Sequence, residues 1–308
     1  MRIVALFVVI VLQPMPVLAQ PLRVTGTSVL LAPPPGFVAS ERFPGFERAD
    51  LQASIMVTEI PAPASEMMRG MTAPALATRG MTLISSTTQV LDGRPSLLLK
   101  VSQQAPGATV LKWMIVSGDV NTSVMIVGTF PREREPQIGE AMKDAVLSTR
   151  WNAAAAPPDH FEGLAFRISP LNLLKIAGRM SNMLVLTETG KIAPQGAGAA
   201  VFVAGTSLAA VDLADLKGFA TARARQTKQL NTLRVLEERP TTIAGETAYE
   251  LIADGKDTAT GRPVTLYQVV LADRDGYVLM QGMVASPRAS ELVPEFRKVA
   301  QTYRKVSH

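Results

Sequence analysis

The chain has 308 residues, a formal net charge of +5 and no cysteine, and 47% of its residues are hydrophobic. The lack of cysteine excludes thiol catalysis, thiolate metal sites and disulfide bridges, and a chain of this length can bury enough apolar surface to fold without bridges. The basic residues are dispersed and only 5% of the residues are aromatic, so nucleic-acid binding is not expected. The positive charge favours weak attraction to anionic surfaces.

The N-terminal segment has the layout of a secretory signal peptide. Arg2 is followed by an apolar run from Ile3 to Leu12 and then by Val17-Leu18-Ala19, which has small residues at the −3 and −1 positions of a signal-peptide cleavage site. This order predicts a signal peptide over residues 1–19, cleaved after Ala19; the alternative is a buried N-terminal strand. The run is shorter than the roughly 20 apolar residues that a membrane-spanning helix needs. We therefore expect an exported, periplasmic protein of the bacterial envelope that does not span the membrane.

The first half of the chain, residues 20–151, predicts the element order β-β-α-β-β-β-β-α. Apolar and β-branched runs bounded by turn residues place its strands at Ser28 to Ala32, Ser54 to Ile60, Thr82 to Val90, Ser96 to Gln103, Val110 to Ser117 and Ser123 to Phe130. Ser65 is the predicted cap of a helix that runs toward Gly80, and Pro74 should kink or restart that helix. An amphipathic helix from about Pro136 to Arg150 closes this half.

A Pro-rich linker, residues 152–163, separates this half from residues 164–308. The second half repeats the same order, with strands at Ala165 to Ile168, Ala200 to Thr206, Thr232 to Glu238, Glu246 to Ala253, Pro263 to Ala272 and Gly276 to Val284. Asp212 is the predicted cap of a helix that reaches Gln229, and a second helix is expected from Pro287 to Lys305. The segment Leu171 to Ala199 has no counterpart in the first half and is expected to add a strand at Met183 to Glu188.

The two halves carry one apolar pattern twice. Residues 110–151 align without a gap on residues 264–305, at an offset of 154 residues that takes Ile138 to Leu292 and Met142 to Phe296. Four consecutive strands joined by short turns must pair antiparallel, because parallel neighbours need a long crossover. The sequence therefore predicts an α+β protein made of two tandem α/β sandwich domains, each an antiparallel sheet covered by helices.

Three features carry a resemblance to a known fold. They are the strand before a proline-rich turn at Val29 to Pro33, the small residues of Asp92-Gly93 and Ala244-Gly245 between strands, and the strands of Gly128 and Gly282 that lead into the last helices. Their order and spacing resemble the Mog1/PsbP-like fold, as a tandem duplication over residues 24–151 and 164–306. The resemblance implies an accessory or docking role. Members of that fold share no catalytic motif, so it assigns no functional residue.

Catalytic constellations are missing from the sequence. His160 stands in the linker and His308 ends the chain, and neither has a serine or a second histidine at a spacing typical of a triad or a metal site. Asp254 and Asp257 are the carboxylates on which a hydrolase would depend, but no second acid is spaced to support them. We therefore predict a non-enzymatic protein without catalytic residues.

Two metal hypotheses compete with simpler interpretations. Met68 with Met71, and Met180 with Met183, are spaced to hold Cu(I), but methionine stripes on a helix usually fill the core. Asp273 to Gly276 resembles the start of a calcium loop, as does Asp119 to Asn121, but position 284 is valine where the loop needs glutamate. The sequence therefore predicts no metal and no cofactor.

Trp113 and Tyr267 occupy equivalent positions in the two halves. Packing under the helices is the favoured interpretation, and an aromatic grip on a partner is the alternative. The expected function is that of an exported, non-enzymatic accessory or docking protein of the envelope, which uses a sheet face or the interdomain groove and has another envelope protein as its partner. The alternative is a periplasmic carrier of a small ligand or metal in that groove.

Overall fold

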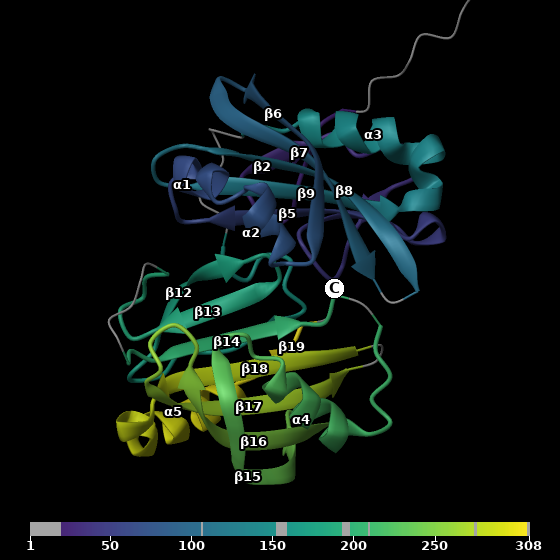
Figure 1. The fold of residues 1–308 in the computed structure, drawn as a ribbon. Helices are drawn as coiled ribbons and strands as arrows, with labels where there is room; N and C mark the ends of the chain where they lie inside the picture. The colour runs from purple at the N-terminus through teal and green to yellow at the C-terminus, as the bar shows by residue number, and fades with distance from the viewer. Residues whose placement is uncertain are drawn as a thin grey trace, which may run out of the picture.

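The computed structural model of the chain describes residues 20–105, 107–151, 159–192, 198–208, 210–273 and 276–306. The predicted signal peptide, most of the predicted linker, Asp275 and His308 lie outside these ranges. Within them, the chain forms two seven-stranded antiparallel sheets that share no strand (Figure 1). The predicted α+β architecture of two tandem sandwich domains is confirmed. None of the helices within these ranges is long and apolar enough to cross a membrane.

The first domain contains ten strands, three α-helices and two 3-10 turns among the described residues. In chain order they are β1 Leu22–Arg23, β2 Val29–Leu31, β3 Val38–Ala39, β4 Gly45–Arg48, η1 Ala49–Leu51, β5 Ala53–Ile60, α1 Ala64–Arg69, α2 Ala73–Ala77, β6 Met81–Leu91, β7 Arg94–Ala105, β8 Ala108–Gly118, β9 Ser123–Pro131, η2 Arg132–Arg134, α3 Glu135–Leu147 and β10 Arg150–Trp151. The main sheet has the order β3-β4-β5-β9-β8-β7-β6, and β1, β2 and β10 form a small separate sheet.

The second domain repeats this layout. Its elements are β11 Phe166–Arg167, β12 Lys175–Met180, β13 Met183–Thr187, β14 Val201–Thr206, α4 Leu216–Arg225, β15 Leu230–Ile243, β16 Glu246–Asp257, β17 Pro263–Asp273, β18 Gly276–Ala285, η3 Ser286–Arg288, α5 Ala289–Gln301 and β19 Arg304–Lys305. The sheet order β12-β13-β14-β18-β17-β16-β15 matches that of the first sheet strand for strand. The bounds of α3 and α5, and those of β10 and β19, differ by the 154 residues of the sequence repeat.

Helices cover both faces of each sheet, and each domain closes its own interior. In the first domain α3 packs on a core that contains Ile55, Ile126 and Met142, while α1 and α2 cover a second cluster around Leu99 on the opposite face. In the second domain α5 covers the core of Phe202, Tyr267 and Phe296, and α4 covers a cluster of Ala224, Leu251 and Leu266. Alternating strand residues supply the two faces, as the period of two along a strand requires.

Equivalent glycines let the closing helices lie directly on the strands. A Cβ at Gly128 would stand 2.7 Å from the sulfur of Met142, and one at Gly282 would stand 2.5 Å from Cγ of Phe296. No real Cβ contact is that short, so a side chain at either position would force its neighbour to move: the flexible Met142 at Gly128 and the ring of Phe296 at Gly282. Helix-to-sheet packing thus explains why a glycine stands in each of the two strands that lead into the last helices.

The hairpin turns expected at Asp92-Gly93 and Ala244-Gly245 are confirmed. All four residues have positive φ, at 51° and 75° in the first turn and 52° and 85° in the second. Two consecutive left-handed residues define the turn whose twist matches that of the flanking strands.

The prediction that Leu171 to Ala199 has no counterpart is wrong. The structure places β12 and β13 in this segment, at the positions in their sheet that β3 and β4 occupy in the first sheet. The predicted strand at Met183 is confirmed as β13, which pairs with β14 over its whole length. The counterpart was missed because β3 has two residues and β4 has four, too few to show an alternating pattern.

Two predicted helix caps are also wrong. Ser65 lies inside α1, which begins after Pro63, while Thr72 caps α2 by accepting a hydrogen bond from the backbone of Ala75. The restart predicted at Pro74 is confirmed, because a proline fits the first turn of a helix. The cap of α4 is Asp215, whose carboxylate accepts from Gly218 N at 2.8 Å, and the helix ends at Arg225 rather than Gln229.

The side chain of Asp212 accepts a hydrogen bond from the backbone N–H of Ala214, in the turn before α4. Asp212 therefore stabilises this turn and does not cap the helix. The helices α3 and α5 end before the predicted ends at Arg150 and Lys305. After each helix the chain continues into a short strand, β10 or β19. Tertiary pairing with β2 and β11 therefore ends each helix earlier than its apolar pattern indicates.

Candidate binding cleft between the domains

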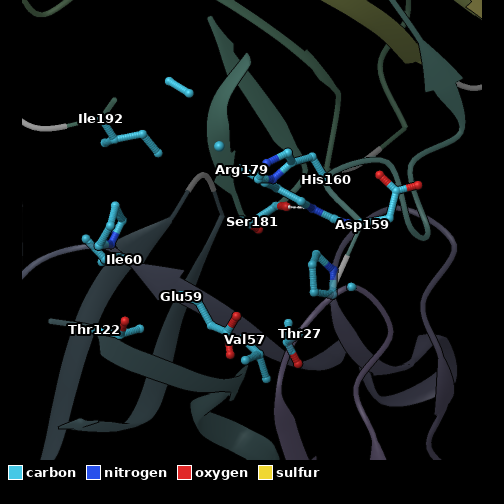
Figure 2. A pocket seen from close by; sticks show the side chains of 15 residues that line it. Thr27, Val57, Glu59, Ile60, Thr122, Asp159, His160, Arg179, Ser181 and Ile192 are labelled. Carbon is cyan, nitrogen blue, oxygen red and sulfur yellow. Dashed lines mark hydrogen bonds between the residues drawn. The ribbon is translucent and has the colours of Figure 1, made fainter. Parts of the chain in front are cut away.

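A cleft of about 260 Å³ lies where the two domains meet, and both domains line it (Figure 2). The first domain contributes the end of β5 and the turn between β8 and β9, and the second contributes β12 and the turn that follows it. His160, from the predicted linker, also lines the cleft. The interdomain groove expected from the sequence is therefore present among the described residues.

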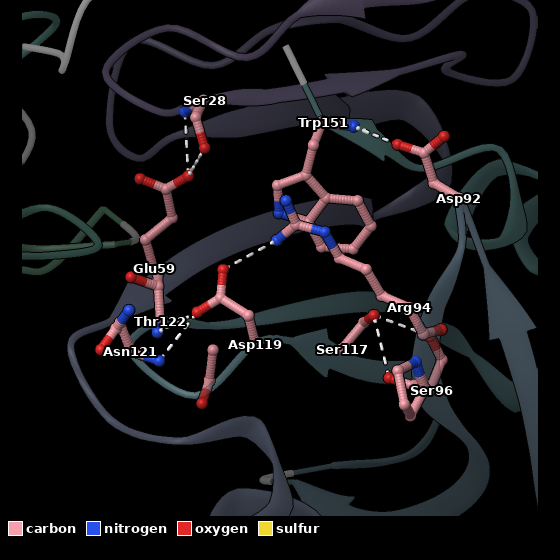
Figure 3. A network of polar contacts seen from close by, with 12 residues as sticks. Ser28, Glu59, Asp92, Arg94, Ser96, Ser117, Asp119, Asn121, Thr122 and Trp151 are labelled. Carbon is pink, nitrogen blue, oxygen red and sulfur yellow. Dashed lines mark hydrogen bonds and ion pairs between the residues drawn. The ribbon is translucent and has the colours of Figure 1, made fainter. Parts of the chain in front are cut away.

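The wall from the first domain is fixed by two polar side chains. Glu59, near the end of β5, accepts hydrogen bonds from the backbone N–H of Ser28 at 2.9 Å and from its hydroxyl. Thr122 belongs to the β8–β9 turn, in which Asp119 accepts from the backbone N–H groups of Asn121 at 2.8 Å and of Thr122 at 2.9 Å (Figure 3). These hydrogen bonds fix the first-domain wall of the cleft in the absence of a ligand.

Further contacts in Figure 3 tie this wall to the rest of the first domain. Arg94 pairs with Asp119 at 3.4 Å and stacks over the ring of Trp151, with its Cζ 4.4 Å from the ring centroid. The backbone N–H of Trp151 donates to Asp92 at 2.9 Å. The β8–β9 turn is thus connected to β10 and to the β6–β7 hairpin through one arginine.

Arg179, on β12, forms the opposite wall. Its Nε donates to the carbonyl of Ser181 at 2.5 Å, and its Nη1 donates to the carbonyl of Glu162. Burial lowers the pKa of Arg179 to about 10, although the charges of Glu162 and Glu59 act in the opposite direction. Figure 2 shows Arg179 and Glu59 on opposite sides of the cleft. A cation and an anion thus face one cavity without a hydrogen bond between them in the structure.

An ion pair and two glycines close the joint beside the cleft. Arg23 donates two hydrogen bonds to the carboxylate of Glu162, at 2.6 and 2.7 Å, and this pairing lowers the pKa of Glu162 although burial opposes it. Gly26 has a φ of +73° and abuts Arg179, so any side chain there would strike the guanidinium. A Cβ at Gly163 would stand 2.7 Å from the Cγ2 methyl group of Thr25. The domains therefore meet at two glycines whose neighbours leave no room for a side chain.

The chemistry of the cleft suits binding. Val57, Ile60 and Ile192 give it apolar walls, and Arg179 and Glu59 give it two opposite charges. Ser181 lines it, and the buried hydroxyl of this residue has no hydrogen-bond partner in the structure. Buried polar atoms are normally paired, so an unpaired hydroxyl in a cleft wall offers a hydrogen bond to a ligand. Among the described residues no group of three His, Asp or Glu side chains is placed to hold a metal ion.

The other residues that the sequence singled out have structural positions. Trp113 and Tyr267 are buried in the cores beneath α3 and α5, as the packing interpretation predicts. Met71 is buried, and Met67 and Met68 pack against the same cluster. Met180 and Met183 pair directly across the β12–β13 hairpin.

The acidic candidates take part in local structure. Asp254 accepts from the hydroxyl of Thr265 at 2.8 Å, and Asp257 accepts from the backbone and hydroxyl of Thr260, both at 2.7 Å. Asp273 pairs with Lys305. Of the candidate functional residues named from the sequence, only His160 lines the cleft among the described residues, and neither Arg179 nor Glu59 was predicted.

No family model and no curated protein matches the chain. Solved structures do resemble it. Mog1p, the Ran-binding protein of Saccharomyces cerevisiae, is 11% identical, with a TM-score of 0.35 over 46% of this chain and 91% of its own. PsbP of the cyanobacterium Synechocystis is 16% identical, with a TM-score of 0.30 over 45% of this chain and 97% of its own. Mog1/PsbP-like proteins are thus among the structures that the chain resembles, as the sequence pattern predicts.

A third match spans both domains. The type VI secretion immunity protein TplEi of Pseudomonas aeruginosa is 13% identical, with a TM-score of 0.32 over 92% of this chain and 96% of its own. The first two matches each cover a little under half of this chain, whereas this one covers most of it.

Proposed function

We propose that the protein is an exported, non-enzymatic accessory protein that docks a segment of a partner protein in the interdomain cleft. One observation carries the proposal: a residue of the cleft wall, Ser181, holds a buried, unpaired hydroxyl beside the partly buried cation of Arg179. Both groups can donate a hydrogen bond to a ligand oxygen at a site that neither domain forms alone. A backbone carbonyl or carboxylate of the partner would satisfy them.

The size of the cleft favours a protein segment over a free small molecule. Pockets for drug-sized ligands usually measure about 300–1,000 Å³. At about 260 Å³ the cleft lies below this range and fits one or two side chains of a loop. Its apolar walls suit an aliphatic side chain, while Glu59 and Arg179 would orient the backbone or charges around it. The partner that we propose is another protein of the envelope.

Site-specific photocrosslinking tests this docking directly. A benzophenone amino acid placed at Ala177 or Thr122 lies in the cleft, and one placed at Ala259 lies in a separate groove of the second domain. We expect an adduct with a discrete partner from the cleft positions and none from position 259. The substitution Ala177→Trp should fill the cleft and abolish the adduct formed from Thr122, while Ala259→Trp should leave it unchanged. Equal adducts from all three positions, or none from the cleft, would contradict the proposal.

The export part of the proposal rests on the N-terminal sequence alone and has its own test. N-terminal sequencing of the protein recovered from a periplasmic extract should begin at Gln20. A protein that stays in the cytoplasmic fraction with Met1 in place would contradict export without affecting the cleft.

A further inference from the structure

The two main sheets end in equivalent edge strands that are protected to different degrees. β6 pairs only with β7, and β15 pairs only with β16. The outer strand β15 carries the sequence Arg234 to Pro240, which contains two arginines, two glutamates and a proline. β6, from Met81 to Leu91, contains no charged residue, no proline and no glycine. Charges and proline are the usual means by which an edge strand is kept from pairing, so only β15 is protected in this way.

The outer part of β6 is regular and exposed. After one bulge at Leu83/Ser85, the strand pairs residue for residue with β7 up to Leu91. Ser85 to Thr88 are exposed, and Val90 is 73% exposed. Threonine and valine favour strands, and an edge strand leaves a row of N–H and C=O groups unpaired. β6 therefore presents a seven-residue template for one more strand.

We propose that this template pairs with β6 of a second copy of the chain. The two strands would run antiparallel about a two-fold axis at Thr88, which joins two seven-stranded sheets into one continuous sheet. Thr88 would face Thr88 of the partner subunit, and Ser86 would face Val90 of the partner subunit. Cross-strand pairs of threonine and β-branched residues are favourable, and no like charges meet because β6 has no charge.

The choice of a second copy rests on this self-complementarity. A two-fold contact places one surface patch against itself, so the patch must tolerate its own charges and shape. A neutral, regular, β-branched strand does so, whereas pairing two β15 strands would bring their charged residues and Pro240 together. β6 is also the sheet edge opposite β3 and β4, and it lies away from the second domain (Figure 1). The dimer would thus leave the cleft of each copy open.

Single cysteines test both the contact and its register, because the chain has no cysteine of its own. In the full-length purified protein, Thr88→Cys would place two sulfur-bearing residues opposite each other at the axis, within the Cα separation of a disulfide. Ser85→Cys, on the same strand, would lie about 20 Å from its symmetry mate. We expect Thr88→Cys to form a covalent dimer on air oxidation, and Ser85→Cys to stay largely monomeric on a non-reducing gel. Equal crosslinking of the two variants would overturn the proposed pairing.

Solution mass tests the same proposal without a new cysteine. Light scattering over a dilution series should give twice the mass of the chain at high concentration. The double substitution Thr88→Lys/Val90→Lys should shift the protein to the monomer, because like charges would meet across the axis. Thr242→Lys, at the position of β15 equivalent to Val90, should leave the dimer intact. A wild-type protein that is monomeric throughout, or a double variant that stays dimeric, would overturn the proposal.

Discussion

The position of Trp113 in the first sheet and that of Tyr267 in the second are equivalent, but their surroundings differ. Two lysines stand over Trp113, with the Nζ of Lys100 at 5.0 Å and that of Lys143 at 5.5 Å from the ring centroid. Tyr267 is fully buried and donates its hydroxyl to Glu250 at 3.1 Å. Glu250 in turn pairs with Arg297 at 2.9 Å and Arg239 at 3.0 Å.

The difference follows from substitutions between the copies. Arg297 replaces Lys143 on the helix, and Glu250 stands on β16 where the first sheet has Leu98 on β7. A tryptophan ring can satisfy a partly exposed cation by its π face, whereas a buried tyrosine hydroxyl needs a hydrogen-bond acceptor. The second domain therefore contains a buried carboxylate, only 4% exposed, at a position where the first domain has a leucine. Duplicated cores can keep their shape while their polar chemistry diverges.

Intrinsic fluorescence separates the two domains experimentally. Both tryptophans, Trp113 and Trp151, belong to the first domain, and all four tyrosines, at positions 249, 267, 277 and 303, belong to the second. Tryptophan emission therefore reports the unfolding of the first domain, and tyrosine emission reports that of the second.

The largest loss of stability is expected from Glu250→Leu, which gives the second domain the leucine that the first domain has at the equivalent position, Leu98. It leaves the buried Tyr267 hydroxyl without an acceptor and removes the partner of Arg297, at a cost of about 3 kcal/mol. Urea unfolding followed by tyrosine emission measures the loss. Glu238→Leu, which breaks only the exposed pair with Lys217, should cost much less, because water screens an exposed ion pair. Equal losses of stability for the two variants would show that the buried network of Glu250 stabilises the domain no more than an exposed ion pair does.

The next effect compares the two strand glycines. Gly282→Ala forces a methyl group against the rigid ring of Phe296 and should cost about 2–3 kcal/mol. Gly128→Ala meets the flexible side chain of Met142 and should cost about 1 kcal/mol, because a thioether can change rotamer. Urea titrations with both fluorescence signals give the two values. The reverse order would contradict the packing account.

A pH titration sharpens the comparison further. Burial disfavours the charged form of Glu250, but the hydrogen bond and charge of Arg297 outweigh burial, and the pKa of Glu250 lies below its usual value. A carboxyl with a lowered pKa stabilises the fold above its unfolded pKa, and this contribution is lost as the pH falls through the folded pKa. The stability advantage of the wild type over Glu250→Gln should therefore be full at neutral pH and shrink below about pH 4.5. A stability advantage of the wild type that does not change with pH would contradict a lowered pKa of Glu250 in the folded protein.

The smallest effect is expected from Lys143→Ala in the first domain. Loss of one partly exposed cation over Trp113 should cost about 0.5–1 kcal/mol. Lys143→Arg should keep most of the stability, because a guanidinium also stacks on an indole ring. Tryptophan-monitored unfolding checks both variants. A loss as large as that of Glu250→Leu would mean that the two sites are energetically alike.

The parts of the fold that the sequence predicted are those with local signals. The helices α3 and α5 follow an apolar period, and Asp92-Gly93 is a turn that its two residues determine. The strands β3 and β4 carry no such signal, because their pairing with β5 depends on contacts made elsewhere in the sheet.

The cleft was predicted only as a groove between the domains. Arg179 and Glu59 lie in different domains, and nothing in the sequence around either residue indicates that they share a cavity. Met180 and Met183, which follow Arg179, were considered as copper ligands in the sequence analysis. The residue of this segment that lines the cleft is Ser181. Its unpaired hydroxyl follows from the three-dimensional packing of the hairpin and has no counterpart in sequence spacing.

Selective unfolding of the full-length protein is the most direct test of the central claim that one sandwich was duplicated and that each copy closes its own core. Gly282→Ala alters a contact inside the second core only. In urea, the transition seen by tyrosine emission should move to lower denaturant, while the transition seen by the two tryptophans stays where it is in the wild type. Parallel movement of both transitions would show a single shared core and would contradict the account.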